Sequence, residues 1–537
     1  MAKDKRLGAD DQKLWDEYCG FLNLGLKDYM YIQNRLFLEQ IKRWSSSEIG
    51  KKMLKEKEPQ TVEEFRSVMP LTTYEDYSNI LLARQKEMLP GEPLVWIQTT
   101  WEGGLRPIKL APYTREMLDI YRHNVISIMI LGAAKKKNDI NLRLGDAILY
   151  GGAPLPYATG LVPSLLNEKY KFTWLPDSDE YATLSFSERI KKGFEFAHLK
   201  GIDYFFGLGS VANYITESFS KKGTSGKRRI KISPKIAFRY IRAKYISKRD
   251  GKPILPKDIF KIKGFISSGT DAKCYKEKLG AAWGITPIEI AAGTESTCIG
   301  TETWERNGMV FFPDACFYEF IPESEMMKNL DRPSYKPKTC LIDEVNKDQN
   351  YELVISVFKG GVFARYRIGD VYRCVSAGGN EVPRFTFVDR VPWVIDIAGF
   401  TRITESSINN IISLSKLNIG DWFARKEYSD GNCPYLHVYA EIKPNAYESD
   451  VLSMRVLHEH MTIYFKSFDS DYEDLKKLLD IDPLKITILK RGTIKKYESI
   501  SGSPFKKINP SEIDVISLLK LEKGNSKKIL HEEANIT

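Results

Sequence analysis

The stretch from residue 352 to residue 390, ELVISVFKGGVFARYRIGDVYRCVSAGGNEVPRFTFVDR, contains the strand and turn signals that the expected fold depends on. Its first apolar residues alternate as in a half-buried strand, the chain breaks at Gly360-Gly361, and strand character returns up to Gly369-Asp370. Because glycine adopts positive φ, a tight turn at Gly369 would hold the Asp370 carboxylate at a sheet edge. Such a carboxylate can accept hydrogen bonds from both hydroxyls of a ribose, although an aspartate that caps an ordinary turn has the same local pattern.

The length and composition indicate a globular protein with more than one domain. At 537 residues the chain exceeds the size at which a single hydrophobic core keeps growing. The apolar fraction of 42% and the charged fraction of 28% are typical of soluble proteins. The first residues lack the apolar core of a signal peptide, and the seven cysteines never show C-x-x-C spacing. We therefore expect a cytoplasmic protein with reduced thiols, and a monomer.

The net charge of +10 comes from one window of the chain. Residues 221–250 hold twelve Lys or Arg and a single acid, so the window carries +11 and the remainder 10 − 11 = −1. Apolar residues at helical spacing within this window predict an amphipathic cationic helix: Ile236, Tyr240, Ile241 and Tyr245. Such a helix could lie on an anionic membrane, dock an acidic carrier protein, or pack on its own domain through the same stripe. No recognition module for nucleic acid accompanies the charge, so nucleic acid is not an expected partner.

A second turn-rich stretch, QTTWEGGLRPIKLAPYT at 98–114, follows a strand expected at Pro93–Thr99. Hydroxyls, two glycines and then basic residues after a strand can cradle a phosphate, with backbone N–H groups and Lys109 facing the anion. An ordinary hairpin turn is the better explanation of the bare pattern.

Two later strands also end in turns of small residues. The strand expected at Lys261–Ile266 runs into SSGT at 267–270, and the strand at Ile288–Ala292 runs into GTES at 293–296. Repeated strand-to-turn patterns place several turns at one edge of an open α/β sheet, where such sheets bind ligands. The segment GLGSVA at 207–212 fits a dinucleotide fingerprint, but basic residues stand where the ribose-binding acid would be, so NAD is not expected.

After Asp389-Arg390 the pattern changes to a smaller α+β unit. We expect strands at Leu436–Ile442 and Leu484–Leu489 and helices at Glu448–Phe465 and Tyr472–Leu479. A lysine-rich loop, KRGTIKKYESISGSPFKKINP, follows the last of these strands.

These turns, in this order, resemble the acyl-adenylating (adenylate-forming) enzyme superfamily. Within it, the chain is similar to the plant auxin-responsive acyl acid amido synthetases and their bacterial relatives. The segments that carry the resemblance are TTWEGGLRPIKL at 99–110, AAGTES at 291–296, FYEFIP at 317–322, ARYRIGD at 364–370, VDR at 388–390 and GFTRITE at 399–405. The resemblance implies an α/β fold with a large N-terminal domain over residues 1–388. It also implies a small mobile α+β C-terminal domain over residues 389–537, behind a hinge at Asp389-Arg390.

The resemblance further implies ATP- and Mg²⁺-dependent adenylation of a carboxylic acid, followed by acyl transfer to an amine or a thiol, such as an amino acid or CoA. The implied catalytic residues are Thr294 and Glu295 at the α-phosphate and Lys507 in the C-terminal domain, with Lys506 as the alternative to Lys507. Glu295 would also bind Mg²⁺. The implied nucleotide-binding residues are Thr99, Thr100, Gly103, Gly104 and Lys109 at the phosphates, Ser268, Gly269 and Thr270 at the adenine, and Asp370 and Arg390 at the ribose.

Three residues depart from the family pattern. Trp101 and Glu102 replace a glycine and a threonine of the phosphate loop, and Ala291 stands where the family has an aromatic residue beside the adenine. A bulky ring limits backbone approach to a phosphate, and a carboxylate repels a triphosphate. The alternative function is therefore a catalytically weakened homologue that binds an acyl group or lipid at a membrane or carrier-protein surface.

Overall fold

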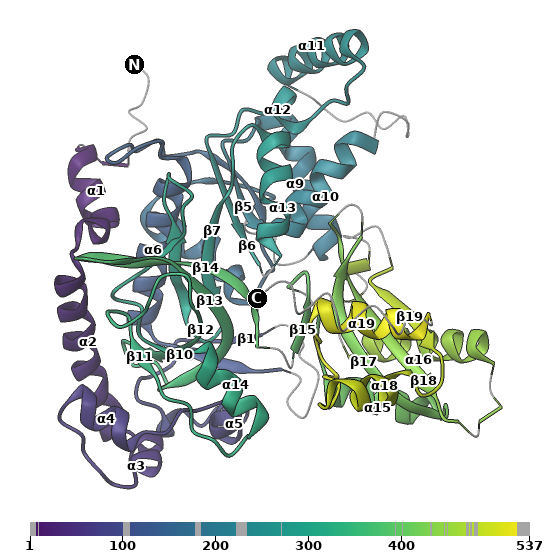
Figure 1. Ribbon diagram of the computed structural model, residues 1–537. Helices are drawn as coiled ribbons and strands as arrows, with labels where there is room; N and C mark the ends of the chain where they lie inside the picture. The colour runs from purple at the N-terminus through teal and green to yellow at the C-terminus, as the bar shows by residue number, and fades with distance from the viewer. Residues whose placement is uncertain are drawn as a thin grey trace. The chain divides into compact units, whose positions relative to one another are not determined.

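In the computed structural model the chain forms two compact units (Figure 1). The structure describes residues 7–8, 10–99, 108–177, 184–221, 233–269, 271–391, 394–399, 401–429, 432–444, 446–447, 449–468, 472, 475–476 and 482–523. Among these residues, the first unit ends at Asp389 and the second begins at Arg390.

The first unit is built on a 12-stranded sheet with the strand order β11-β10-β12-β13-β14-β9-β8-β7-β6-β5-β3-β4. The strands are β3 (Ala147–Gly151), β4 (Thr173–Leu175), β5 (Tyr204–Leu208), β6 (Gly264–Ser268), β7 (Ile288–Gly293), β8 (Thr297–Glu302), β9 (Met309–Phe311), β10 (Cys316–Pro322), β11 (Cys340–Leu341), β12 (Asn350–Val357), β13 (Tyr366–Gly378) and β14 (Glu381–Arg390). The pairs among β3 to β7 are parallel. In the rest of the sheet, from the pair β7–β8 to the pair β10–β11, the strand pairs whose register is defined are antiparallel.

The parallel half of the sheet is covered by helices, and most residues of its strands are apolar and buried. The helices of this half are α6 (Arg115–Ala133), α7 (Val162–Lys169), α9 (Phe186–Lys200), α10 (Gly209–Lys221) and α13 (Ala272–Trp283). Every residue of β3 is buried, as expected for a strand covered on both faces. Leu208 pairs with Ser268 at the ends of β5 and β6. The turns that follow these parallel strands therefore begin at one edge of the sheet.

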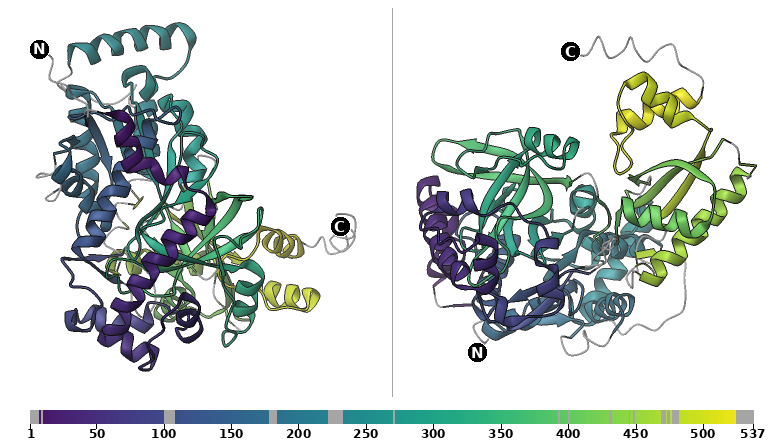
Figure 2. Two further views of the ribbon diagram at one scale, coloured as in Figure 1. Left: turned by 90° about the vertical axis from the view of Figure 1, so that its left-hand side faces the viewer. Right: turned by 90° about the horizontal axis from the view of Figure 1, so that it is seen from below.

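The N-terminal helices pack on the antiparallel half of the sheet, where α2 contacts β10 (Figures 1 and 2). They are α1 (Asp11–Cys19), α2 (Leu26–Ser46), α3 (Glu48–Leu54), α4 (Val62–Val68) and α5 (Glu75–Leu82). Gln33 of α2 donates hydrogen bonds from Nε2 to two backbone carbonyls, at 2.6 Å to Pro313 and 2.8 Å to Cys316. Phe37, one turn further along α2, stacks on Phe317 with ring centroids 4.1 Å apart.

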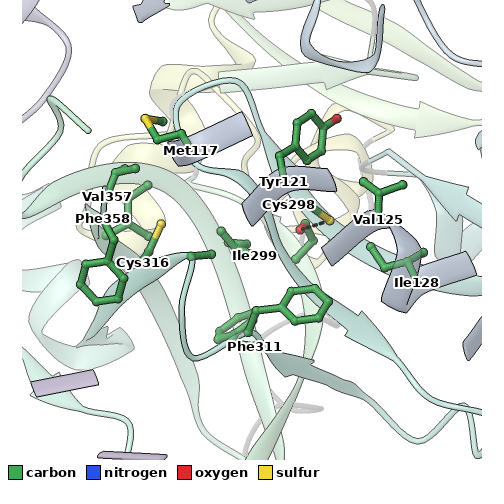
Figure 3. Close-up of a cluster of buried hydrophobic side chains, with 14 of the residues drawn as sticks. Met117, Tyr121, Val125, Ile128, Cys298, Ile299, Phe311, Cys316, Val357 and Phe358 are labelled. Atoms are coloured by element: carbon green, nitrogen blue, oxygen red, sulfur yellow. Dashed lines mark hydrogen bonds between the residues drawn. The ribbon is translucent and has the colours of Figure 1, made fainter. Parts of the chain in front are cut away.

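The hydrophobic core continues across the sheet through α6 (Figure 3). Met117, Tyr121 and Val125 lie on one face of α6, where they belong to the same buried cluster as Ile299 of β8 and Phe311 of β9. Residues spaced by four positions share one face of a helix, which explains why these three meet the same strands.

The tight turn predicted at Gly369-Asp370 is wrong in one respect, because the chain does not leave the sheet there. β13 runs on without interruption, and the pairing with β12 moves from Glu352 opposite Val371 to Val354 opposite Arg367. The extra residues on β13 form a bulge, in which Gly369 has φ 82°. Glycine is therefore required as expected, but for a bulge inside a strand instead of a turn at its end.

The basic window contains a helix whose faces differ from the predicted ones. Residues 233–250 of the window are described, and most of them form α11 (Pro234–Asp250), which lies at one end of the first unit next to α12 (Pro256–Ile259) (Figure 1). Ile236 faces the protein at 2% exposure, whereas Ile241 and Tyr245 are 70% and 69% exposed. The predicted single apolar stripe is therefore divided between an inner and an outer face.

The second unit contains a small sheet and a separate hairpin. The hairpin pairs β15 (Val394–Ile397) with β16 (Thr401–Thr404), and the sheet has the order β17-β18-β19. The sheet strands are β17 (Ile419–Tyr428), β18 (Pro434–Ile442) and β19 (Leu484–Leu489), and the helices are α15 (Glu405–Ser415), α16 (Asp450–Phe468), α18 (Thr493–Ser501) and α19 (Glu512–Glu522). The segment predicted as a lysine-rich loop thus contains α18, and most of the helix expected at 472–479 lies outside the described residues. Among the described helices of the whole chain, none is long and apolar enough to cross a membrane.

Candidate active site

The Thr294-Glu295 turn between β7 and β8 is held by two tyrosine hydroxyls. Tyr366, the first residue of β13, donates a hydrogen bond of 2.9 Å to Oε1 of Glu295. Tyr113 donates a hydrogen bond of 2.6 Å to the carbonyl oxygen of Thr294. Burial raises the pKa of the Tyr113 hydroxyl, so this group stays protonated and donates. Glu295 is 8% exposed, and in the described part of the chain only its Oε1 atom accepts a hydrogen bond, which leaves Oε2 for a cation.

Two buried ion pairs fix the backbone on either side of Tyr366. Arg365 binds Glu319 of β10 through both oxygens, with Nε–Oε2 and Nη2–Oε1 distances of 3.0 Å. Arg367 binds Glu352 of β12 in the same two-point manner, at 2.7 Å and 2.6 Å. Paired guanidinium–carboxylate contacts of this kind fix orientation as well as distance. The pairs therefore determine where the Tyr366 ring points.

The Arg365 pair is the centre of a larger buried network. Arg365 also donates from Nη1 to the carbonyl oxygens of Arg66 and Met69, and the Arg66 side chain reaches Glu319 at 2.9 Å. Burial alone would raise the pKa of Glu319, but Arg365, Thr339 and Arg66 hold it below its usual value. Arg365 has φ 46°, a left-handed backbone that these contacts keep in place.

The sequence did not identify these charged residues as positioning residues. Glu319 and Glu352 lie within apolar strands, and a carboxylate in that position needs a cationic partner. This signal alone could have predicted the ion pairs, although it does not say which arginine meets which carboxylate.

The bulge that carries Asp370 lies against the Thr294-Glu295 turn. A Cβ atom added to Gly293 would lie 3.2 Å from Cδ1 of Ile368 and 3.9 Å from Oε2 of Glu295. Asp370 itself is 9% exposed. The strand segment that carries the predicted ribose carboxylate thus contacts Gly293, the residue before the predicted phosphate-binding turn, although 75 positions separate Glu295 from Asp370 (370 − 295).

The turn after β6 lies at the same edge of the parallel sheet. Ser268 Oγ donates to the carbonyl oxygen of Gly207 in β5 at 3.4 Å, and Gly269 has φ 105°. Gly207 also approaches the Gly151 backbone so closely that an added Cβ would lie 2.5 Å from it. Glycines at 151 and 207 thus let the two backbones approach closely near the ends of β3 and β5. Thr270, the third predicted adenine-binding residue, lies outside the described residues.

The predicted phosphate loop connects β1 (Val95–Gln98) to β2 (Leu110–Tyr113), which pair antiparallel. Thr99 and Lys109 close the stem of this hairpin through two hydrogen bonds. The Thr99 amide donates to the Lys109 carbonyl at 3.0 Å, and the Lys109 amide donates to the Thr99 hydroxyl at 3.1 Å. Lys109 Nζ lies 5.9 Å from the centre of the Tyr74 ring. The predicted residues Thr100, Gly103 and Gly104, like the divergent Trp101 and Glu102, lie outside the described residues.

The two predicted site residues of the second unit are held by carboxylates of that unit. Arg390 Nε lies 3.8 Å from Oδ2 of Asp396, an oxygen to which Arg402 also donates at 3.0 Å. Lys507 Nζ lies 3.8 Å from Oε1 of Glu405 and 5.4 Å from the centre of the Trp422 ring. In this structure, therefore, Lys507 has partners within its own unit.

No cluster of three or more His, Cys, Asp or Glu among the described residues could hold a metal ion by itself. A Mg²⁺ ion that binds with a nucleotide takes most of its ligands from phosphates and water and only one or two from carboxylates. The Oε2 atom of Glu295, which accepts no hydrogen bond from the described residues, can supply one such carboxylate ligand. Glu295 thus fits a Mg²⁺ ion that enters with a nucleotide, but the described residues do not form a metal site without one.

Two family models match the chain, and both concern the same family. The GH3 family N-terminal domain matches residues 20–147, and the GH3 family central domain matches residues 309–390. The central-domain match contains Tyr366, Asp370 and both partners of the ion pairs Arg365–Glu319 and Arg367–Glu352.

Curated relatives match shorter parts of the chain. The chain is 27% identical over 230 residues to a jasmonoyl–L-amino acid synthetase, GH3.5, of Oryza sativa subsp. japonica. This alignment covers 38% of each protein. It is 37% identical over 78 residues to a probable indole-3-acetic acid-amido synthetase, GH3.1, of the same plant, which covers 14% of this chain and 12% of the relative. The aligned parts are thus well under half of the relatives' length.

Solved structures match nearly the whole fold. The acyl acid amido synthetase AtGH3.15, in complex with 2,4-DB, has a TM-score of 0.53 at 16% identity, with 96% of this chain and 97% of that chain covered. A 2-hydroxyisobutyryl-CoA ligase in complex with 2-HIB-AMP and CoA has a TM-score of 0.52 at 14% identity, with 86% of both chains covered. Two GH3 family models, for the N-terminal and the central domain, thus match parts of the chain, and its fold is similar to that of AtGH3.15 and of the CoA ligase.

Proposed function

We propose that this chain activates a carboxylic acid with ATP to an acyl-adenylate and transfers the acyl group to an amine or a thiol. The observation that carries the proposal is the contact between the Thr294-Glu295 turn and the Asp370 bulge, held by the buried hydrogen bond from Tyr366. Two carboxylates of the open α/β sheet, one in the turn after β7 and one in the bulge of β13, suit a nucleotide that presents a ribose and a phosphate.

In the activation step a carboxylate oxygen of the acid attacks the α-phosphorus of ATP, and the bond to pyrophosphate breaks. Asp370 would accept hydrogen bonds from the ribose hydroxyls, and Thr294 would donate to an α-phosphate oxygen. Glu295 would hold Mg²⁺, which supplies positive charge against the phosphate oxygens when it is bound. Tyr366 keeps Glu295 in place before the nucleotide arrives, so this charge is preorganised.

The boundary at Asp389-Arg390 would act as the hinge between an N-terminal domain over 1–388 and a C-terminal domain over 389–537. Lys507 would approach the phosphate during activation and withdraw before acyl transfer. Its contact with Glu405 does not oppose such a movement, because both side chains are about half exposed, at 40% and 52%. An ion pair as exposed as this one is worth less than about 1 kcal/mol.

An amine is the preferred acceptor, because the GH3 relatives in sequence are named as amino acid and acid-amido synthetases. The similarity to a CoA ligase is a similarity of fold, at 14% sequence identity. A thiol is therefore the second choice of acyl acceptor. The seven cysteines are scattered along the sequence and never show C-x-x-C spacing, and we propose a cytoplasmic location on this ground.

The proposal is tested by carboxylate-dependent exchange of labelled pyrophosphate into ATP, with a panel of aromatic and aliphatic acids. Exchange with one class of acid, followed by amide formation on addition of amino acids, is expected. The absence of exchange with every acid, together with the absence of ATP or AMP binding in calorimetry, would remove the enzyme proposal and favour a weakened homologue that binds an acyl group.

A second function, docking to an anionic lipid surface, is favoured by the outer face of α11. Phe238, Ile241 and Tyr245 lie at helical spacing and are 68%, 70% and 69% exposed. The helix has six Lys or Arg and only one acid, which complements a negatively charged surface: Lys235, Arg239, Arg242, Lys244, Lys248, Arg249 and Asp250. The inner face is occupied, because Tyr240 shares a hydrogen bond of 2.8 Å with His198. An exposed apolar stripe within a cationic helix suits the headgroup region of a membrane.

Co-sedimentation with phosphatidylcholine vesicles, with and without phosphatidylserine, tests this docking. Sedimentation should require the anionic lipid, weaken with salt and decrease in Ile241→Ser. Leu94→Ser, a change of a 61% exposed leucine outside α11, is the control and should have no effect. Sedimentation that is equal with neutral vesicles would contradict the proposal. Retention on a purified acidic carrier protein without any sedimentation would replace the lipid surface by that partner.

A further inference from the structure

The small sheet of the second unit carries a series of three hydrogen-bonded side chains, one from each of its strands. The strands are labelled in Figure 1, and Glu427 comes from β17, His437 from β18 and Thr487 from β19. Nδ1 of His437 lies 2.7 Å from Oε2 of Glu427, and Nε2 of His437 lies 2.8 Å from Oγ1 of Thr487. A carboxylate, an imidazole and a hydroxyl are thus joined in series.

The register of the sheet explains why these three side chains meet. His437 pairs with Arg425 in β17 and with Lys485 in β19. Glu427 and Thr487 each lie two positions further along their strands than these partners, and side chains two positions apart point to the same face of a sheet. The three groups therefore share one face, on which Glu427 and Thr487 reach His437 diagonally.

The hydrogen bonds around Glu427 determine which ring nitrogen of His437 donates. Burial alone would raise the pKa of the Glu427 carboxyl, but His437 and two tyrosine hydroxyls lower it to about 2. These hydroxyls belong to Tyr435 and Tyr439, which donate at 3.0 Å and 2.9 Å. Because an ionised carboxylate only accepts, Nδ1 of His437 donates to it. In the neutral ring, Nε2 then has a lone pair and accepts from the Thr487 hydroxyl, as in an imidazole that activates a nucleophile.

A second histidine of the chain shows what the carboxylate adds. His198 also shares a hydrogen bond of 2.8 Å with a hydroxyl, that of Tyr240, but its Nδ1 lies 2.7 Å from the carbonyl oxygen of Phe194. A carbonyl orients the ring as well as a carboxylate does, but it lacks the negative charge that stabilises an imidazolium formed by proton transfer. The pair of His437 with Glu427 therefore suits a general base, and the contacts of His198 suit packing.

The hydroxyl end of the series is accessible, whereas its middle is buried. His437 is 3% exposed and stacks on the Tyr439 ring with centroids 3.9 Å apart, which holds the imidazole in place. Thr487 is partly exposed, and Lys485, two positions before it on the same face of β19, is exposed. The Lys485 ammonium lies 6.0 Å from the centre of the Tyr435 ring. A cation beside Thr487 favours the negative charge that develops on a carbonyl oxygen under attack.

We propose that Thr487 is a nucleophile for activated acyl groups, with His437 as its general base and Glu427 as the residue that positions the imidazole. The substrates are acyl compounds with a good leaving group, such as phenyl esters and acyl-phosphate anhydrides. A good leaving group departs without a dedicated proton donor besides His437. An acyl-adenylate belongs to this class, but the site does not depend on the activation proposed for the first unit.

The reaction has two steps. Oγ1 of Thr487 attacks the acyl carbon while its proton moves to Nε2 of His437, and the bond between the acyl carbon and the leaving group breaks. The proton on Nε2 passes to the leaving group, which restores the neutral imidazole. A water molecule then attacks the acyl-threonine and loses a proton to Nε2, and this proton returns to Oγ1 as the carboxylic acid is released.

Hydrolysis of p-nitrophenyl acetate by the purified full chain, without ATP, tests the site. The original protein should release p-nitrophenol and, after a rapid acid quench, carry an acetyl group on Thr487 that mass spectrometry of the peptide locates. Neutral hydroxylamine should remove this group because it is an ester, whereas acetyl groups on lysines are amides and should remain. Thr487→Val, which keeps the shape but lacks the hydroxyl, should carry no hydroxylamine-sensitive acetyl group and should hydrolyse the ester more slowly.

Three further variants separate catalysis from a structural role. Thr487→Ser keeps the hydroxyl and lacks the methyl group, so it should be acetylated at this position at least as fast as the original protein. His437→Gln, which can still donate to Glu427, should slow this acetylation by about a hundredfold or more. Ser499→Ala removes an exposed hydroxyl of α18 that donates to the Lys496 carbonyl at 2.8 Å, and it should change neither hydrolysis nor acetylation.

Hydrolysis by Thr487→Val at the rate of the original protein, or acetyl groups on lysines alone, would overturn the proposal. A Thr487→Ser variant no more reactive than Thr487→Val would do so as well. Failure of pyrophosphate exchange would leave these measurements unaffected, because they use neither ATP nor a free carboxylic acid.

Discussion

Replacement of Arg365 with methionine should destabilise the first unit by about 3 kcal/mol. The Glu319 side chain is 1% exposed and Arg365 binds both of its oxygens. Breaking a buried ion pair by removing one partner costs about 3–5 kcal/mol, because the other charge remains buried. Arg66 still reaches Glu319 at 2.9 Å in the variant, which places the loss near the lower end of this range.

Urea unfolding followed by fluorescence measures the loss in the free energy of unfolding. The transition of the first unit is analysed separately, because a chain of two units need not unfold in one step. The double variant Glu319→Gln/Arg365→Met removes the uncompensated charge and should regain a large part of the stability. Arg35→Met is a suitable control, because it breaks an exposed pair with Glu39 and should cost less than about 1 kcal/mol. A loss below about 1 kcal/mol in Arg365→Met, or a double variant no better than the sum of its parts, would refute the reasoning.

The same ion pair gives a pH dependence with a definite sign. The Glu319 pKa is lowered from 4.5 in the folded protein, so its contribution to stability is complete above pH 4.5 and is lost as the pH falls through the lower folded pKa. Without Arg365, burial dominates and the folded pKa rises. Stability in Arg365→Met should therefore begin to fall at a higher pH than in the original protein, as urea midpoints between pH 3 and pH 7 would show.

Three further variants test the site. Tyr366→Phe should cost about 1–3 kcal/mol and slow pyrophosphate exchange, because Glu295 loses its buried donor, whereas Tyr335→Phe, which removes a donor to Glu325, should leave exchange unchanged. Asp370→Ala should weaken AMP binding in calorimetry with an unchanged circular dichroism spectrum, and an unchanged affinity would exclude a ribose contact. Lys507→Ala should slow adenylation far more than acyl transfer in single-turnover experiments, and equal slowing of both steps would contradict a hinge that alternates.

The sequence predicts the main elements of the fold because hydrophobic periodicity and caps act locally. The strand expected at Leu484–Leu489 is present with those bounds as β19. The sequence likewise predicts that the segments around Thr294 and Asp370 lie close together, and in the structure Gly293, just before the Thr294-Glu295 turn, contacts Ile368 of the bulge that carries Asp370.

The remaining features depend on partners that local patterns do not specify. Gly369 is needed for positive φ in a turn or in a bulge, and only the register with β12 decides between them. The apolar residues of α11 do not share one face of the helix. Ile236 and Ile241 differ by five positions, so they point in nearly opposite directions around the helix axis. The pairs of Arg365 and Arg367 with Glu319 and Glu352 join segments 46 and 15 residues apart, which composition cannot assign.

The most direct test of the central proposal is mass-spectrometric detection of the acyl-adenylate itself. The purified chain, incubated with ATP, Mg²⁺ and a mixture of carboxylic acids but no acceptor, should retain one or a few acyl-AMP species that hydrolyse slowly while they are bound. Asp370→Ala, treated in parallel, should retain much less. Bound acid without any adenylate, in a preparation that still binds ATP, would contradict the account.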